Sequence, residues 1–258
     1  KSLFIVCRPK QWTKNLLIYA ASLFTFSFNS DYWIFSTKAF ILFCMISSAV
    51  YIINDILDVE SDKQHETKRF RPIASGVLPV NLAGLFFILL VLTTITLSTL
   101  FNPKFCLILI SYFAIQILYC LSLKKQPILD IFCIAFGFIF RAIAGIVVTN
   151  TIPSHWFILS IAFLSLFLAI EKRKAELRIS IDRGIIIRRV LMRYSLPLLQ
   201  RLESLVATSA FMTYTLWASG PSLNGASTSW MLLSIPFVLV GIFRYQLLSD
   251  PEEFERKK

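Results

Sequence analysis

The sequence predicts an all-α fold, a polytopic transmembrane helix bundle. Of its 258 residues 56% are hydrophobic and only 16% are charged, and the mean hydropathy is +0.69. So few charged residues cannot cover a globule of this size with polar surface. They occur in blocks separated by apolar stretches of membrane-spanning length. Lipid offers no partner for backbone polar groups, and the alternating ten-residue pattern of a β-barrel is absent, so we expect helices.

Eight apolar segments are predicted to cross the membrane, each near the roughly 20 residues that a hydrocarbon core demands. They lie at residues 15–29, 34–53, 80–100, 103–121, 128–149, 155–170, 197–219 and 230–248. The connections between them therefore alternate between two sides. The first side holds the N-terminal segment, residues 54–78, 122–127 and 171–196, and the residues after 248.

The basic residues indicate which side is cytoplasmic. All but five of the 26 Lys and Arg residues lie on the first side, the exceptions being Lys38, Lys104, Arg141, Arg201 and Arg244. By the positive-inside rule this side faces the cytoplasm, which predicts an integral protein of a bacterial-type inner (plasma) membrane. We interpret residues 1–258 as one transmembrane helical domain with catalytic cytoplasmic loops at 54–78 and 171–196, because long polar loops on one face usually carry function.

The first of these loops begins with acidic residues directly after an apolar segment. If that helix continues, Asp55, Asp58 and Asp62 stand at i, i+3 and i+7 on one face. Three like charges on one stripe repel each other, so we expect cations to offset them. Together with Asn54 they are hard oxygen ligands that suit Mg²⁺, which typically binds one or two carboxylates plus substrate phosphates.

A basic run, Lys68-Arg69-Phe70-Arg71, follows the acidic residues. A metal held by carboxylates beside guanidinium and ammonium groups is what a bound diphosphate requires. Two plainer interpretations compete with this one. The acids can form a solvated helix end paired with Lys63, Lys68 and Arg69, and the basic run can be ordinary positive-inside bias. Ionisable groups at the mouth of a membrane bundle favour the functional interpretation.

Two charged residues fall within or beside a single predicted span. Asp130 and Arg141 lie eleven residues apart, about three helical turns, so they share a face without touching. Asp130 is near the cytoplasmic end, where it can be a ligand or a hydrogen-bond partner. Arg141 is nearer the middle of the membrane and is costly there without a partner. It is either a phosphate contact at the bottom of a cavity, or a structural ion pair or snorkelling residue.

The motifs NDxxDxxxD at residues 54–62 and KRxRPxxSG at residues 68–76 resemble the first signature of the UbiA superfamily of intramembrane prenyltransferases. Within it, the chain is most similar to the decaprenyl-phosphate phosphoribosyltransferase branch. The patches that carry this similarity are RPKQWTKN at 8–15, YCLSLK at 119–124, Asp130 with GFIFRAIAG at 137–145, and KRKAEL at 172–177. Members commonly have nine spans, so we expect one more, either outside these 258 residues or merged into another span.

One departure from the superfamily pattern is informative. Aromatic-acid and quinone prenyltransferases of the superfamily carry a second Asp-rich motif, DxxxD, after the sixth helix. Here the acids at that place are Glu171 and Glu176, which are five residues apart and point about 140° away from each other on a helix. Positive charge replaces the motif, at Lys172, Arg173, Lys174 and Arg178. A donor with a phosphate besides its diphosphate would use these cations, although a loop that binds anionic lipid fits them too.

The resemblance implies a Mg²⁺-dependent glycosyltransferase. In its reaction a polyprenyl (decaprenyl-type) phosphate attacks phosphoribosyl pyrophosphate and yields polyprenyl phosphoryl 5-phosphoribose and diphosphate, for synthesis of cell-envelope (cell wall) polysaccharide precursors. The implied partners are these two substrates and membrane lipids, with a homo-oligomer left open. Nucleic-acid binding is not expected, because the charge follows topology rather than a recognition element.

The resemblance also implies roles for individual residues. Asn54, Asp55, Asp58 and Asp62 are the candidates for the catalytic Mg²⁺–diphosphate site. The candidates for substrate binding are Lys14, Asn15, Lys68, Arg69, Arg71, Tyr119, Lys124, Asp130, Arg141, Lys172 and Glu176. Two alternatives stay open: a transferase that moves a prenyl group from its diphosphate to an aromatic acceptor, and a non-catalytic lipid-binding or transport protein.

Overall fold

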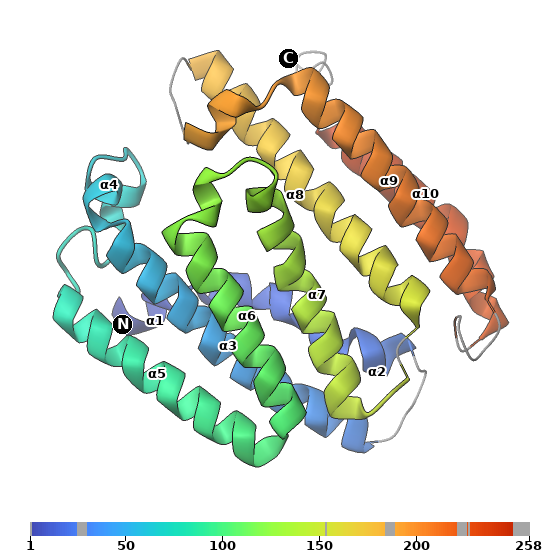
Figure 1. Ribbon diagram of the computed structural model, residues 1–258, viewed down its shortest axis with the longest axis horizontal. Helices are drawn as coiled ribbons and strands as arrows, with labels where there is room; N and C mark the ends of the chain where they lie inside the picture. The colour runs from blue at the N-terminus through green and yellow to red at the C-terminus, as the bar shows by residue number, and fades with distance from the viewer. Residues whose placement is uncertain are drawn as a thin grey trace. The chain divides into compact units, whose positions relative to one another are not determined.

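The computed structural model describes residues 2–24, 30–152, 154–183, 189–220, 226 and 228–249. Within them every regular element is a helix, which confirms the predicted all-α fold (Figure 1). Six of the eight predicted spans coincide with segments long and apolar enough to cross a membrane. These are α3 (Ser30–Leu57), α5 (Val80–Phe101), α6 (Pro103–Leu121), α7 (Leu129–Thr149), α8 (His155–Arg183), and Ser229–Leu248, which joins η5 (Ser229–Ser234) to α10 (Ile235–Leu248).

The other two predicted spans differ from those six. Residues 15–24 belong to a 3₁₀ helix, η1 (Pro9–Tyr19), and a short α-helix, α2 (Ala20–Phe24), while residues 25–29 lie outside the described part. The span at 197–219 is α9 (Leu196–Ser219), which is long enough to cross a membrane but is richer in Ser and Thr than the six. The short elements that remain are α1 (Ser2–Val6), α4 (Val59–Lys63), η2 (Lys68–Phe70), η3 (Leu123–Lys125) and η4 (Arg189–Arg193).

Helix starts are set by local side-chain chemistry. Asn102 precedes α6 in an extended conformation, and its side-chain oxygen accepts from the backbone N–H groups of Lys104 (2.9 Å) and Phe105 (3.1 Å). Pro103 occupies the first helical position, where its missing N–H costs nothing. Ser195 caps α9 in the same way, accepting from the N–H of Leu198 at 3.3 Å. The starts of α6 and α9 are therefore set by their own capping residues.

Contacts along the chain divide it into two compact units, which are described separately. The first comprises Lys1–Leu123 with Phe140–Thr151, and the second comprises Lys124–Ile139 with Ile152–Lys258. Helix α7 contributes its first half to the second unit and its second half to the first. The organisation of the whole chain as one domain stays a prediction.

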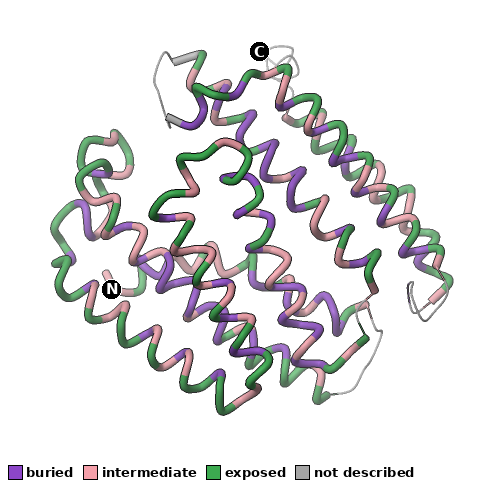
Figure 2. The backbone as a smooth tube through the Cα atoms, viewed as in Figure 1, coloured by how far each residue is buried: buried purple, intermediate pink, exposed green. Residues whose placement is uncertain are grey.

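In the first unit, α3 is central and packs against α5, α6 and η1 (Figure 1). Its buried side chains include Phe43 and Ile46, which join Phe105 of α6 in one apolar cluster. Over half of its most apolar stretch is buried, whereas α5 is mostly exposed (Figure 2). Large apolar side chains such as Leu85 and Leu92 cover that exposed surface, as a helix facing lipid requires.

The second unit is built on α8 and α9, which pack along each other. Phe167 of α8, Leu191 and Leu199 are almost fully buried in its apolar cluster. Helix α10 packs on α9 and, like α5, exposes most of its apolar side chains (Figure 2). Both units therefore leave apolar surface for the membrane.

Candidate active site

The acidic residues lie where α3 ends. Helix α3 includes Asn54 and Asp55 and stops at Leu57, because Asp58 leaves the helical conformation (φ −97°, ψ 7°) before α4 begins. The backbone hydrogen bonds nevertheless carry on, from Asp58 N–H to the Asn54 carbonyl (3.0 Å) and from Asp62 N–H to the Asp58 carbonyl (2.8 Å). Asp55 and Asp62 are buried and Asp58 is half-buried.

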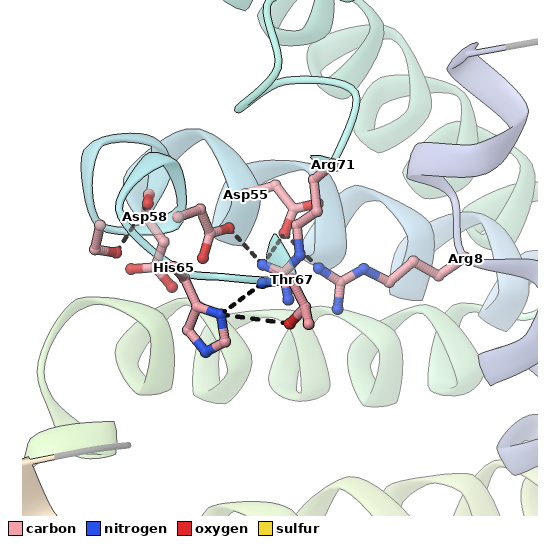
Figure 3. A network of polar contacts seen from close by, with 8 residues as sticks. Arg8, Asp55, Asp58, His65, Thr67 and Arg71 are labelled. Atoms are coloured by element: carbon pink, nitrogen blue, oxygen red, sulfur yellow. Dashed lines mark hydrogen bonds and ion pairs between the residues drawn. The ribbon is translucent and has the colours of Figure 1, made fainter. Parts of the chain in front are cut away.

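Two arginines offset the acidic residues (Figure 3). Nη1 of Arg71 lies 3.1 Å from Oδ1 of Asp55 and 2.5 Å from Oδ2 of Asp62. Arg8 donates through Nη2 to the same Oδ1 of Asp55, and its guanidinium lies over the ring of Tyr51. The expectation of cationic offset is thus confirmed. Of the cations in the solvated-end interpretation, Lys63 bonds Glu60, at 2.7 Å.

Of the three carboxylates predicted to share one helix face, the structure brings two together. Asp55 and Asp62 converge on one nitrogen of Arg71, whereas Asp58 begins α4. In the described part of the chain, no three His, Cys, Asp or Glu side chains are placed to hold a metal ion. Two carboxylates around one cation still fit Mg²⁺, whose remaining ligands are usually water and substrate phosphates. The oxygen ligands suit Mg²⁺, and in this structure the cation between the two carboxylates is the Arg71 guanidinium.

The loop that carries Arg71 is tightly folded. Arg71 N–H donates to the Lys68 carbonyl at 2.9 Å, and the Arg71 carbonyl accepts from Ser75 N–H at 2.8 Å. Gly76 adopts a left-handed conformation (φ +78°), which explains a glycine there. Lys68 is half-buried, and Arg69 is exposed with its guanidinium 4.9 Å from the ring centre of Phe70. Of the two arginines in the basic run, Arg71 therefore contacts the acids and Arg69 is exposed.

In the second unit, the basic run predicted to bind phosphate contains both buried and exposed cations. Arg173 is fully buried, with Nε 2.6 Å from Oδ2 of Asp130 and Nη1 2.5 Å from Oε2 of Glu176. Lys174 is buried between Glu171 (2.6 Å) and Glu203. Because neighbouring residues on a helix point in different directions, Lys172 is exposed. Arg173 and Lys174 are thus held by carboxylates. Residues 184–188 of the loop lie outside the described part.

Asp130 is the centre of a buried polar cluster. Its carboxylate is fully buried and accepts from Arg173 and, at 2.7 Å, from the hydroxyl of Tyr194. The Tyr194 oxygen in turn accepts from the N–H of Ile128 at 2.5 Å, and Ile128 has a left-handed backbone (φ 72°), which is costly for a β-branched residue. Burial, aided by the Asp130 carboxylate, raises the pKa of Tyr194, so the hydroxyl stays a donor.

Arg141 and Asn15 are partners in the first unit. Nε of Arg141 donates to Oδ1 of Asn15 at 2.7 Å, and Nη2 donates to the hydroxyl of Tyr112 at 3.2 Å. The guanidinium also lies 5.5 Å from the ring centre of Phe43. These hydrogen bonds and cation–π contacts stabilise a buried charge in the membrane. Asn15 is fully buried beside Arg141, while its neighbour Lys14 is exposed.

The remaining candidates have simpler surroundings. Tyr119 packs against the apolar cluster of α3 and α6, and Lys124 is half-buried in η3. Sequence reasoning gave no role to Arg8, Tyr112, Tyr194 or Glu203, which the structure places in direct contact with predicted residues. Only Arg8 carried a signal, since it opens the RPKQWTKN patch.

Comparison with known proteins gives a consistent result. The model of the UbiA prenyltransferase family matches residues 15–258. A protein of Mycobacterium tuberculosis named decaprenyl-phosphate phosphoribosyltransferase is 39% identical over 95% of this chain and 84% of its own length. One of the same name from Mycolicibacterium smegmatis is 38% identical over 97% and 84%. A UbiA homologue from Archaeoglobus fulgidus, solved with GPP and Mg²⁺, superposes with a TM-score of 0.73 over 96% of this chain and 87% of that one, at 18% identity, which shows a shared fold.

Proposed function

The chain belongs to the UbiA prenyltransferase family, and from this premise we propose that it transfers the 5-phosphoribosyl group of phosphoribosyl pyrophosphate to a polyprenyl phosphate of decaprenyl type. The relatives named for that activity match nearly the whole chain. The observation in the structure that supports it is the pair of buried carboxylates, Asp55 and Asp62, converging on one cation at the end of α3. The lipid-linked product would serve as a precursor of cell-envelope polysaccharide.

In this proposal Mg²⁺ is held by Asp55 and Asp62, with Asp58 and Asn54 one turn away. When bound, the metal neutralises charge on the diphosphate and aids its departure. The solved relative bound to GPP and Mg²⁺ supports a divalent metal in this fold. Asp58 would join the residues that hold the metal after adjustment of the α3–α4 junction, where its backbone is irregular.

The basic residues bind the donor phosphates in this proposal. Arg71 suits a bidentate contact, and Lys68, Arg69, Lys124, Lys14 and Lys172 supply ammonium and guanidinium groups at half-buried or exposed positions. We assign Asp130, Glu176, Asn15 and Arg141 to positioning, since each is engaged by buried protein partners. Asp130 and Glu176 hold Arg173, and that leaves Lys172 facing outward.

The reaction needs alignment and charge stabilisation more than acid–base chemistry. A phosphate oxygen of the lipid forms a bond to the anomeric carbon of the ribose, and the bond from that carbon to the diphosphate oxygen breaks with its electron pair. The lipid phosphate is already an anion and needs no strong base. Arginine and lysine side chains stabilise the negative charge that grows on the leaving diphosphate.

The apolar helices show that this is a membrane protein. The side of the membrane that each loop faces is part of the proposal. We place the acidic loop and the 171–183 segment on the cytoplasmic side of the plasma membrane, because the basic residues cluster there. A phosphorylated sugar donor is made in the cytoplasm, whereas the polyprenyl phosphate reaches the protein through the bilayer. The two substrates thus have separate routes.

The test uses purified protein, Mg²⁺, polyprenyl phosphate and ribose-labelled phosphoribosyl pyrophosphate, with label counted in the organic phase. We expect label there, and its loss on chelation. Organic-phase label from a labelled prenyl diphosphate and an aromatic acceptor instead would establish prenyl transfer and reject the proposal. Absence of Mg²⁺-dependent turnover in both assays, beside an active relative as positive control, would favour a non-catalytic lipid-binding or transport role.

A further inference from the structure

We propose that Arg71 occupies the metal position between Asp55 and Asp62 before the donor binds, and that it leaves this position when the diphosphate arrives. Arg71 thereby makes tight metal binding depend on the donor. This inference rests on the proposed function for the identity of the donor, while its central measurement needs no donor. It concerns the order in which the site is filled, which neither the family resemblance nor the composition of the motif specifies.

The geometry places a single cation between the two carboxylates. One nitrogen of Arg71 is within hydrogen-bonding distance of Oδ1 of Asp55 and Oδ2 of Asp62 (Figure 3). The side chains of the two acids are 3% and 4% exposed, so their charges are largely removed from water. A metal bridging these oxygens would need the space that the guanidinium now fills.

The charges of the cluster also oppose binding of the metal alone. Four ion-paired residues form the cluster: Asp55 and Asp62 contribute two negative charges, and Arg8 and Arg71 contribute two positive ones, so these four together are neutral. Adding a divalent cation to a neutral, mostly buried cluster leaves an excess of two positive charges, which is costly in a low dielectric. A diphosphate that arrives with the metal cancels that excess and offers Arg71 new acceptors.

Arg71 is better suited to move than Arg8. The Arg71 backbone is fixed by hydrogen bonds with Lys68 and Ser75, so its guanidinium can leave by side-chain rotation alone. The side chains of Arg71 and Arg8 are similarly exposed, 26% and 28%, so their other contacts separate them. Arg8 contacts only one of the two carboxylates, Asp55, and its guanidinium is also held over the Tyr51 ring at 4.9 Å. Arg8 therefore stays as the fixed partner of Asp55 while Arg71 exchanges.

Such an exchange couples the two ligands. If the donor draws Arg71 away from the carboxylates, it raises metal affinity, and by reciprocity the metal raises donor affinity by the same factor. Metal alone would then occupy the site poorly, and metal with diphosphate would occupy it well. The consequence is that the metal enters together with its substrate.

The experiment titrates Mg²⁺ into the detergent-purified full chain by calorimetry, with and without phosphoribosyl pyrophosphate. We expect Arg71→Gln to bind Mg²⁺ alone about tenfold more tightly than wild type, within the usual range of coupling between ligands. In wild type the donor should tighten Mg²⁺ binding by about tenfold, and in Arg71→Gln this gain should nearly vanish. Lys63→Gln is the matched control: it removes one positive charge from the same loop at a residue bonded to Glu60, and its Mg²⁺ affinity should stay within about twofold.

Unchanged or weaker binding of Mg²⁺ alone by Arg71→Gln would overturn the inference. If that variant does not fold, Arg71→Lys keeps the charge but ends one atom short of the Nη1 position that contacts both carboxylates, and it should tighten Mg²⁺ binding by about threefold. Equal affinity in Arg71→Lys and wild type would then reject the proposal. Failure of the proposed function has a different signature: phosphoribosyl pyrophosphate would not alter Mg²⁺ binding in wild type, while the donor-free comparison of Arg71 variants would still stand.

Discussion

Buried charge in this protein is arranged in contacts that join distant parts of the chain. Oδ1 of Asp55 accepts from Arg8 and from Arg71, which are 47 and 16 residues away. Arg173 likewise bonds Asp130 across 43 residues. Removing one member of such a pair leaves an uncompensated charge away from water, which is strongly destabilising. Conservative amide substitutions are therefore the informative probes of the acidic site, since they keep shape and hydrogen-bonding atoms.

Asp62→Asn tests the carboxylate pair directly. The substitution removes one of the two carboxylates that would hold the metal and leaves Asp55 alone, so we expect phosphoribosyl transfer to fall by at least about a hundredfold. Asp58 lies outside the pair, so Asp58→Asn should cost about tenfold. The measurement is initial rate of label transfer at saturating Mg²⁺. Glu66→Gln, an exposed acid of the same loop, should keep the wild-type rate.

Full activity in Asp62→Asn would remove the carboxylate pair from the catalytic site. Full activity in Asp58→Asn alone would limit the metal site to Asp55 and Asp62 and reject the role predicted for the third acid. Equal, large losses in both variants would show that the irregular backbone at Asp58 brings that side chain to the metal after all.

The sequence could predict the acids and the nearby basic run because both lie within one loop. The contact of Arg71 with Asp62 spans only nine residues, so a helix end followed by a turn brings them together. Arg8 could not be found by spacing, since its distance to Asp55 depends on how η1 packs against α3. Lys172 is exposed and Arg173 is buried because of which face of α8 packs against the core. A uniformly basic run has no apolar periodicity, so the sequence does not predict that face.

At the scale of elements, the packing of η1 against α7 relies on one glycine. A Cβ on Gly145 would lie 2.1 Å from the backbone oxygen of Ile18, far inside contact distance. The close approach places Asn15 of η1 beside Arg141, one turn before Gly145 on α7. Hydropathy alone predicts a regular span at 15–29, because hydropathy depends only on the apolar content of the segment. It contains no information on the close backbone contact or on the tighter 3₁₀ geometry found here.

Gly145→Ala should therefore destabilise the protein. The methyl group cannot fit without moving η1 or α7, so we expect a loss of about 1 to 3 kcal/mol and a lower thermal unfolding midpoint in detergent. The matched control is Gly84→Ala in α5, where nothing lies within 4 Å of an added Cβ. Alanine favours a helix over glycine, so Gly84→Ala should leave the midpoint unchanged or raise it slightly. An equal response of both variants would contradict the close packing.

Tyr194→Phe tests the link between the start of α7 and Tyr194, which directly follows η4. The variant loses the hydrogen bond to the buried Asp130 carboxylate and the acceptor of the Ile128 N–H, so we expect a destabilisation of about 1 to 3 kcal/mol. The raised pKa of Tyr194 adds a pH dependence. Above pH 10 the unfolded chain releases this proton and the folded chain retains it, so the stabilisation is complete below pH 10 and declines above it.

The measurement is the difference between the unfolding midpoints of wild type and Tyr194→Phe across pH 8 to about 11. The difference should be constant below pH 10 and shrink above it. Tyr32→Phe, at a half-buried tyrosine of α3, serves as the control for general effects of high pH. A difference that grew with pH would contradict the assigned direction of the hydrogen bond.

At the scale of the whole molecule, the net charge of +11 is distributed by topology. The alternation of apolar helices with basic loops predicts sidedness as well as span positions, and six spans agree between sequence and structure. Long uninterrupted apolar stretches make these spans predictable. Helix α9, which the sequence also predicts as a span, is less apolar than these six, because Gln200, Arg201 and Glu203 lie in its first turns, and its buried face packs on α8.

Sidedness gives the last prediction, which uses two positions of the first unit. Thr67 lies on the acidic loop and Lys104 at the start of α6, and both are exposed. The five native cysteines are free and buried, so they give little background with a membrane-impermeant maleimide. In intact cells we expect the reagent to label Lys104→Cys and to spare Thr67→Cys, and permeabilisation should expose both. Because the positive-inside rule places the acidic loop in the cytoplasm, labelling of Thr67→Cys alone in intact cells would invert the topology and put the acidic site on the side that lacks a cytoplasmic sugar donor.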